Sequence, residues 1–334
     1  MLSSRASCAA LALFAFILPG LSSATENQDH IKQLLSQMSE SVRTLDYRGL
    51  FTYEHGGTLS TLRVVHAVRD GVQYERLQHL SGPEREVLRQ GRPVECLNPG
   101  DQLLQGRFDA FGDQFEGLET YYHFYIRGEE RVAGRDVINI QVKPRDPFRY
   151  GFSLAIDKET GLPLKSLLID AKMRVLERFQ FIELELGPSI MESDYQAVTA
   201  KHRVVDHELS PCNQLAPAQP TGWQAKWLPG GFVFSGQQKT SQGQDMYMFT
   251  DGLTAFSVFV DSNDNPRQPD VKAQRGATVA YMHNLIRNRR AYQITVVGEI
   301  PPGTAQRVAY QMNPVGASPD ATSPSARPAA VPEE

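Results

Sequence analysis

The sequence LAIDKETGLPLKSLLID, from Leu154 to Asp170, decides the fold because it has the pattern of a β-hairpin. Two apolar-rich arms flank a turn that runs from Asp157 to Gly161, and Pro163 just beyond the turn disfavours a helix. Nothing in or beside this segment is suited to catalysis. The hairpin therefore predicts an antiparallel β-sheet in which these apolar arms form a wall.

Similar strands extend from this hairpin in both directions. From Tyr47 onward, runs of about eight residues alternate with turns rich in Gly, Pro and Asp, a pattern typical of an antiparallel meander. Residues 25–45 precede the meander, and their apolar side chains recur at helical spacing, which predicts one amphipathic helix. Near the other end, Phe179 and Phe181 have one parity and Ile182 and Leu184 the other. This switch predicts a bulge, or burial on both faces, in a strongly curved sheet.

Residues 98–117 interrupt the rhythm of the strands. Glycines alternate there with leucines and phenylalanines without a regular period. Loops of this length are uncommon unless they have a function. Two interpretations stay open: the segment covers a cavity, or it packs over the end of the sheet.

The first 24 residues have the layout of a cleavable export signal. Arg5 precedes an apolar run over residues 9–18, which is too short to cross a bilayer that needs about 20 apolar residues, and small residues follow it. We expect residues 1–24, with Cys8, to be removed and the mature protein to be soluble outside the cytoplasm without a lipid anchor. Cys96 and Cys212 remain, either joined in a disulfide or as two buried thiols.

The rest of the chain divides into two domains of an α+β, mainly antiparallel β, fold. Residues 25–200 form the first domain, and the proline-rich residues 201–221 predict a linker. Residues 222–312 predict a smaller mixed β/α domain of five strands, closed by a short helix that begins at Pro301 and Pro302. The Pro/Ala/Ser-rich residues 313–334 are expected to be a disordered tail.

The charges give no sign of nucleic-acid binding. The formal net charge is −4; residues 25–200 carry 21 Lys+Arg against 27 Asp+Glu, and residues 201–334 carry 12 against 11. Arg287, Arg289 and Arg290 form a local basic cluster. A solvated turn and a docking site for a protein partner are the two interpretations of this cluster.

The chain contains none of the common catalytic motifs. There is no G-x-S-x-G, H-E-x-x-H, G-x-G-x-x-G or P-loop sequence, and the histidines are scattered. Asp146 lies between Arg145 and Pro147, with Arg149 nearby; Asp before Pro is common in turns, and we expect the arginines to form surface ion pairs. We therefore predict no enzyme, no cofactor and no metal site. A curved sheet covered by one helix can instead enclose an apolar cavity for a greasy ligand.

Five segments give the chain a resemblance to a known family: LDYRGLFTY, GEERVAGRD, PRDPFRYGFSLAIDKETGLPL, TDGLTAFSVFVD and YQITVVGEIPPGTAQRVA. Together, and in this order, they resemble the MucB/RseB family of periplasmic negative regulators of the sigma-E (AlgU-type) envelope-stress response in Gram-negative bacteria. The resemblance implies a first domain like the carriers LolA and LolB, an unclosed β-barrel with a helical plug. It also implies binding to the periplasmic part of a membrane-anchored anti-sigma factor (MucA/RseA-like), protection of that factor from proteolysis, and release on binding lipid or lipopolysaccharide-type signals.

Two sets of residues become candidates for these contacts. The partner-binding candidates are Arg287, Arg289 and Arg290, and the oligomeric state stays open. The candidates for lining a lipid cavity are Leu50, Phe51, Leu62, Val64, Tyr74, Phe152, Leu154 and Leu168. Ordinary core packing under the helix is an equal alternative for each of them. A periplasmic lipid or lipoprotein carrier, and a hydrolase of envelope lipids, are the competing functions.

Overall fold

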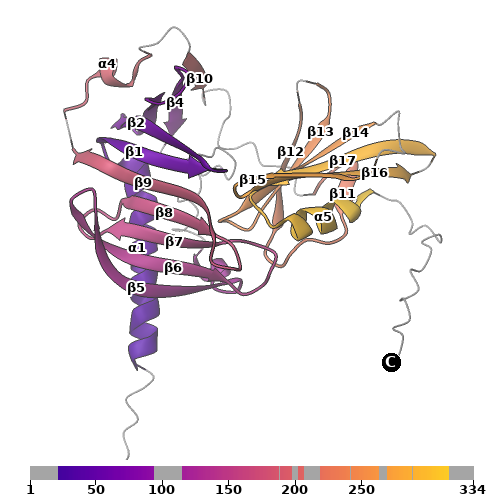
Figure 1. The fold of residues 1–334 in the computed structure, drawn as a ribbon, viewed down its shortest axis with the longest axis horizontal. Coiled ribbons are helices and arrows are strands. Elements are labelled where there is room, and N and C mark those ends of the chain that lie inside the picture. Colours follow the sequence, from indigo (N-terminus) through magenta and orange to yellow (C-terminus); the bar gives the residue numbers. More distant parts are fainter. Residues whose placement is uncertain are drawn as a thin grey trace, which may run out of the picture.

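The computed structural model describes residues 22–93, 115–187, 189–197, 202–206, 219–240, 242–262, 269–287 and 289–315. Its larger sheet has ten strands in the order β10-β4-β3-β2-β1-β9-β8-β7-β6-β5 (Figure 1). These strands are β1 Tyr47–His55, β2 Thr58–Arg69, β3 Val72–His79, β4 Glu86–Pro93, β5 Tyr122–Val132, β6 Arg135–Pro144, β7 Gly151–Asp157, β8 Pro163–Ile169, β9 Val175–Leu186 and β10 His202–Asp206. Only β10, which pairs with β4, is parallel to its neighbour in this sheet. The predicted antiparallel meander is confirmed.

The pairing of β1 with β9 joins the two halves of this sheet. Leu50 lies opposite Glu183 and Phe51 opposite Phe181, so Ile182 is an extra residue in β9. Of the two alternatives that the parity switch left open, a bulge or burial on both faces, the structure has the bulge, and Ile182 is 55% exposed. Gly49 lies beside it with no room for a side chain, because a Cβ atom there would collide with the carbonyl oxygen of Glu183. Bulges and close backbone approaches of this kind bend a sheet.

Helix α1, Ser22–Thr44, lies in the hollow of the bent sheet (Figure 1). It touches β2 and β5, which lie in opposite halves of the sheet. Ile31, Leu35 and Met38 are buried in the same core as the inward side chains of the strands. Burying one such side chain contributes about 1.5–3 kcal/mol, so this face is what holds the helix in place. Since β5 and β10 are the two edges and do not pair, the sheet is an unclosed barrel with a helical plug, as expected.

The turn of the β7–β8 hairpin is fastened to this helix. Asp157 accepts hydrogen bonds from the backbone N and the Oγ1 of Thr160, at 3.0 and 2.7 Å, and forms a bidentate ion pair with Arg135. Gly161 has φ of 79° and lies against Gln37 of α1. The hydroxyl of Ser41, also on α1, donates to the carbonyl of Thr160. The hairpin is therefore a wall of the barrel whose turn also grips the plug.

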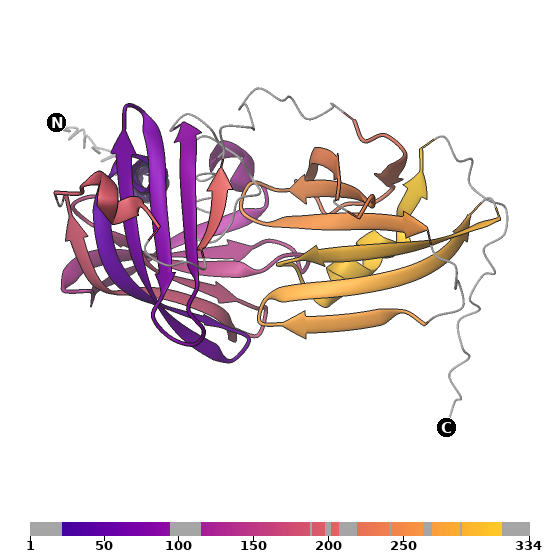
Figure 2. The ribbon, with the colours of Figure 1, turned by 90° about the horizontal axis from the view of Figure 1, so that it is seen from above.

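The smaller sheet has six strands in the order β12-β13-β14-β17-β16-β15 and lies beside the barrel (Figure 2). Its strands are β12 Val233–Lys239, β13 Asp245–Thr250, β14 Ala255–Ser262, β15 Val271–Arg275, β16 Thr278–Arg287 and β17 Arg290–Gly298. Helix α5, Pro302–Tyr310, packs on β16 and β17 and begins at the predicted prolines. Tyr247, Val258 and Val296 are fully buried in the core of this domain. The expected small β/α domain is confirmed.

Two short helices, α3 Phe115–Leu118 and α4 Glu192–Tyr195, complete the fold. Three segments of the chain differ from the expectation. Residues 202–206, expected to belong to the linker, extend the large sheet as β10, which pairs in parallel with the edge strand β4. Asn313 and Pro314, assigned to the tail, belong to strand β18, Met312–Pro314, which pairs with β11, Trp223–Ala225. Strand β15 was missed because its alternation of apolar Val271 and Ala273 with polar neighbours is confined to a strand of 5 residues, all of them exposed.

Candidate functional site

The hollow of the barrel receives most of the residues that were predicted to line a lipid cavity. Six of them lie in the core that packs around α1: Phe51, Leu62, Val64, Phe152, Leu154 and Leu168. The other two point to the outer face. Leu50 is paired with the exposed Arg63, and the ring of Tyr74 lies 4.8 Å from that of Tyr195 of α4. The face that parity left undecided is thus assigned for all eight residues.

One end of the same hollow is polar. His66, Gln73 and Glu75 are buried there on β2 and β3, and Glu75 forms an ion pair at 3.1 Å with Arg89 of β4. The Nδ1 atom of His66 lies 2.7 Å from the carbonyl oxygen of Leu45, and burial lowers the pKa of the imidazole. Within the described residues, no partner is found for the side-chain amide of Gln73 or the Nε2 atom of His66. Sequence reasoning missed this group, although its members share the parity of inward apolar residues.

The junction between the domains is built around Arg149, which lies between β6 and β7 and is 3% exposed. Its guanidinium pairs with Asp146 at 3.0 Å and with Asp251 of the second domain at 2.5 Å, and it donates to the carbonyl of Gly230. The hydroxyl of Tyr122 also donates to Asp251, at 2.8 Å. Burial, helped by the Asp251 carboxylate, raises the pKa of Tyr122 well above its ordinary value. The expected surface ion pair of Arg149 is wrong, because the second domain covers this side chain.

Aromatic groups surround the same guanidinium and extend the junction. The Cζ atom of Arg149 lies 5.1 to 5.3 Å from the ring centroids of Tyr121, Tyr122 and Phe232. Beside them, Arg307 of α5 lies 3.8 Å from the ring centroid of Trp227. Cation–π contacts gain strength when they are removed from water. The two domains therefore meet through buried, oriented groups and not through a loose surface contact.

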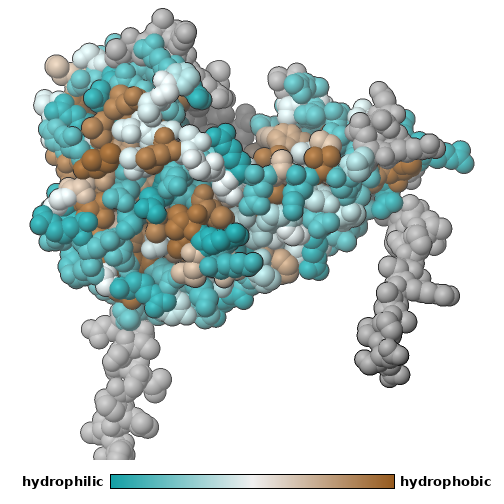
Figure 3. All heavy atoms as spheres, viewed as in Figure 1, coloured by the Kyte–Doolittle hydropathy of each residue, from teal (hydrophilic) through white to brown (hydrophobic). Residues whose placement is uncertain are grey.

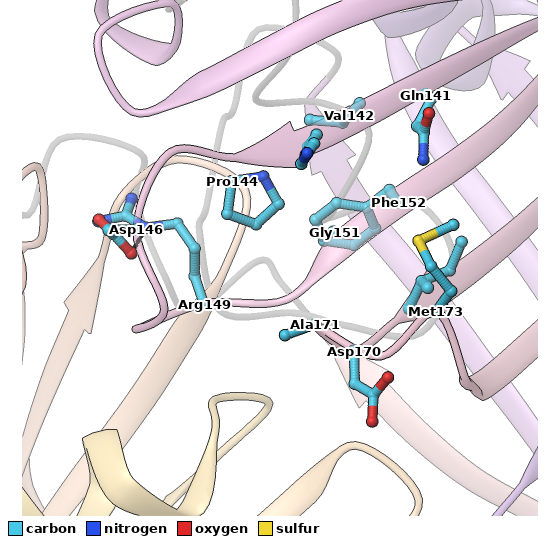
Figure 4. A pocket seen from close by; sticks show the side chains of 12 residues that line it. Gln141, Val142, Pro144, Asp146, Arg149, Gly151, Phe152, Asp170, Ala171 and Met173 are labelled. Atoms are coloured by element: carbon cyan, nitrogen blue, oxygen red, sulfur yellow. Dashed lines mark hydrogen bonds and ion pairs between the residues drawn. The ribbon is translucent and has the colours of Figure 1, made fainter.

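A hollow opens on the outer face of the barrel beside this junction (Figure 4). It has a volume of about 150 Å³. Residues from the ends of β6, β7 and β8, the Asp146–Arg149 turn and the turn after β8 line it: Gln141, Val142, Lys143, Pro144, Asp146, Arg149, Gly151, Phe152, Ile169, Asp170, Ala171 and Met173. Figure 3 shows an apolar patch on this outer face, on the side of the barrel nearest the second domain.

The other predicted site residues lie elsewhere. Arg287, Arg289 and Arg290 are at the β16–β17 turn, at the end of β16 opposite to Thr278. The Thr278 end of β16 is the end near the barrel, because Gly276 just before it lies close to His55 of β1. The basic cluster thus points away from the first domain. Cys96, Cys212, the loop at 98–114 and the export signal up to residue 21 lie outside the described residues. In the part of the chain that is described, no helix is long and apolar enough to cross a membrane.

Family models match both halves of the chain. The MucB/RseB N-terminal domain matches residues 30–200, and the MucB/RseB C-terminal domain matches residues 217–313. The sigma factor AlgU regulatory protein MucB of Pseudomonas aeruginosa is 36% identical over 303 residues, which is 85% of this chain and 91% of that protein. The sigma-E factor regulatory protein RseB of Escherichia coli K12 is 29% identical over 290 residues, 83% of this chain and 88% of that protein.

Solved structures give the same relationship. A crystal structure of MucB in complex with MucA(peri) has a TM-score of 0.69 and 34% identity, and the match covers 85% of this chain and 99% of that one. A second complex, Pseudomonas aeruginosa MucA/MucB, has a TM-score of 0.70 and 35% identity, covering 86% and 100%. The similarity therefore includes both domains.

Proposed function

Because this chain belongs to the MucB/RseB family, we propose that it is a negative regulator of an extracytoplasmic-function sigma factor. It binds the periplasmic part of a membrane-anchored anti-sigma factor and keeps proteases from that segment. The observation that carries the proposal is the similarity, across both domains, to MucB solved together with MucA(peri). A regulator of this kind acts by binding alone, and it needs a stable two-domain surface. The buried ion pair between Arg149 and Asp251 holds the two domains together, so that they can present one stable surface.

The proposal includes export to the periplasm, with residues 1–24 removed, because the partner segment lies there. It also includes release of the partner when lipid or a lipopolysaccharide-type amphiphile binds. What supports this second step is the apolar hollow of the barrel, where six inward residues meet α1. An amphiphile that enters there has to compete with the helix for the same apolar surface.

Isothermal titration calorimetry tests the binding step. The mature protein is titrated with the purified periplasmic segment of the anti-sigma factor from the same genome, and the expected result is a saturable complex. Limited proteolysis of that segment should slow when the complex is formed. Absence of both binding and protection, with the protein folded by circular dichroism, would contradict the regulatory function.

The same complex tests the release step and the competing carrier function. Added lipopolysaccharide should free the anti-sigma segment from the immobilised protein in a pull-down. A carrier would instead bind lipid in fixed proportion, hand it to an acceptor, and leave the anti-sigma segment unbound throughout.

A further inference from the structure

The hollow on the outer face of the barrel is lined in part by Gly151, at a point where β7 lies too close to the end of β6 for a side chain. Gly151 follows the Asp146–Arg149 turn and lies opposite Ile169 of β8. A Cβ atom at Gly151 would lie 2.8 Å from the carbonyl oxygen of Val142 and 3.1 Å from the Cδ atom of Pro144. The backbone therefore has no room for a larger residue at this point, and the neighbouring side chains stand as walls around it (Figure 4).

The rim of the hollow is a rigid turn that presents an exposed methionine. Met173 is 63% exposed and has φ of 62°, a conformation that costs a residue other than glycine about 1–3 kcal/mol. Asp170 holds this turn in place. Its carboxylate accepts hydrogen bonds from the backbone N–H groups of Lys172 and Arg174, and its backbone carbonyl accepts one from the N–H of Met173. Strain that is fixed in this way is concentrated at ligand clamps. The turn holds an adaptable apolar side chain at the edge of the hollow without needing it for the core.

The charges at the rim are unbalanced in favour of cations. Arg149 is paired with two carboxylates, Asp146 and Asp251, and Asp170 is paired with Arg174. Lys143 and Lys172 are exposed beside them, and neither ammonium group has an ion-pair partner among the described residues. This surplus lies on a domain whose residues 25–200 have 21 Lys+Arg against 27 Asp+Glu. An approaching acidic segment is attracted to this point of an otherwise acidic domain.

The size of the hollow decides between a peptide and a lipid. Pockets that enclose a small-molecule ligand have about 300–1,000 Å³, whereas about 150 Å³ holds a single benzene-sized group. One aromatic or branched apolar side chain fits this space, and an acyl chain does not. Such a buried anchor surrounded by polar groups is the usual centre of a protein interface.

We propose that this hollow takes one large apolar side chain of an acidic peptide segment, with Lys143 and Lys172 pairing with carboxylates on either side of the anchor. The proposal rests on the regulatory function above, and the peptide is then part of the anti-sigma segment. Arg149 contributes to the hollow and also holds Asp251. A peptide bound there lies against the junction of the two domains, so its binding depends on how the two domains are positioned relative to each other.

Two variants test the site by independent changes. Ala171→Trp fills the hollow from its rim, and Lys143→Glu with Lys172→Glu reverses the charge. Each is expected to weaken binding of the purified anti-sigma segment by about tenfold or more in titration calorimetry, and the charge reversal should also reduce the salt dependence. Lys272→Glu is the matched control, because this exposed lysine of β15 lies in the other domain and should bind as the wild type does.

A spectroscopic measurement on the wild-type protein adds a direct readout. With 13C-labelled methionine methyl groups, the Met173 signal, assigned from Met173→Leu, should shift when the anti-sigma segment is added. The Met191 signal should not shift, since Met191 is 65% exposed and does not line the hollow.

The outcomes separate this site from the regulatory function. Unchanged affinity in both variants, or a Met173 signal that does not move while the wild type binds, overturns the site and leaves the regulatory function intact. Failure of the wild type to bind overturns both. If the variants bind the anti-sigma segment normally but lose binding to vesicles that contain lipopolysaccharide, the hollow is a site for an anionic amphiphile and the peptide proposal is wrong.

Discussion

At the scale of single residues, Arg149 shows how much a buried charge depends on its partners. Its side chain is fully covered and has carboxylates from both domains and a backbone carbonyl around it. A buried pair of this kind is a weak source of net stability, but removing one member leaves the other charge in a dry site. The buried carboxylate of Asp251 would be left without its cation if Arg149 were truncated.

We therefore expect Arg149→Ala to lower the free energy of unfolding by about 3–5 kcal/mol, measured by urea denaturation. Arg131→Ala is the control, because Arg131 forms an ion pair with Asp136 in which both side chains are 72% exposed. That change should cost less than about 1 kcal/mol. Equal effects of the two substitutions would mean that the junction does not depend on Arg149.

His66 gives a second prediction at this scale, through pH. Burial lowers its pKa below the ordinary value of 6.5, while the carbonyl of Leu45 and the charges of Glu75 and Asp46 partly oppose the shift. As the pH falls below about 6.5, the unfolded chain binds a proton before the folded protein does, so stability present above that pH is progressively lost. His79, whose pKa is also lowered, adds to this slope.

Unfolding midpoints in urea between pH 7.5 and 5 should therefore fall in the wild type and fall less in His66→Gln. His79→Gln serves as the comparison, since His79 lies at the end of β3 and is only partly buried. A wild type whose midpoint is level over this range would contradict a neutral, buried His66.

At the scale of elements, the β7–β8 hairpin is the clearest case in which local sequence was sufficient. The turn residues Asp157 to Gly161 predicted both arms, because each turn residue satisfies a local need: Asp157 bonds to Thr160, and Gly161 adopts a positive φ. The bulge at Ile182 was also predictable from parity. Sequence could not reveal that Gly161 touches Gln37, since a contact over more than a hundred residues leaves no trace in local pattern.

Two glycine substitutions separate the turn from its contact with the helix. Gly161 and Gly134 have φ of 79° and 76°, so alanine is strained to a similar degree at both. A Cβ atom at Gly161 would lie 2.6 Å from Cγ and 3.1 Å from the backbone C of Gln37, whereas Gly134 has open space. We expect Gly161→Ala to be more destabilising than Gly134→Ala by about 1–3 kcal/mol in urea denaturation. Equal losses would show that the turn does not grip α1.

At the scale of the whole molecule, sequence gave the two domains, their order and most strands, and it missed what joins them. The segment from Asp146 to Arg149 was visible as a turn, but Asp251 lies 102 residues further along the chain from Arg149. The burial of His66 and Glu75 was hard to predict although they share the parity of inward apolar residues, because Val65 and Ala67 of the opposite parity are also buried and parity alone does not select the inward face. For the same reason, parity could not show that Leu50 and Tyr74 lie on the outer face. Short-range pattern specifies elements, whereas faces, edges and junctions follow from tertiary packing.

The proposed release step makes a prediction about the whole barrel, because a lipid entering the barrel would need the apolar surface that α1 covers. Ile31, Leu35 and Met38 of α1 occupy the core together with Phe152 and the other inward residues. An acyl chain can make these apolar contacts only where α1 moves away from the sheet. Lipid binding should therefore increase the population of states in which α1 is locally open. Hydrogen exchange of α1 amides is expected to become faster on addition of lipopolysaccharide. Exchange in β13 and β14, in the core of the second domain, should stay the same and is the internal control. If lipopolysaccharide binds while the protection of α1 amides from hydrogen exchange is unchanged, the ligand lies outside the interior of the barrel, and release of the partner does not depend on displacement of α1.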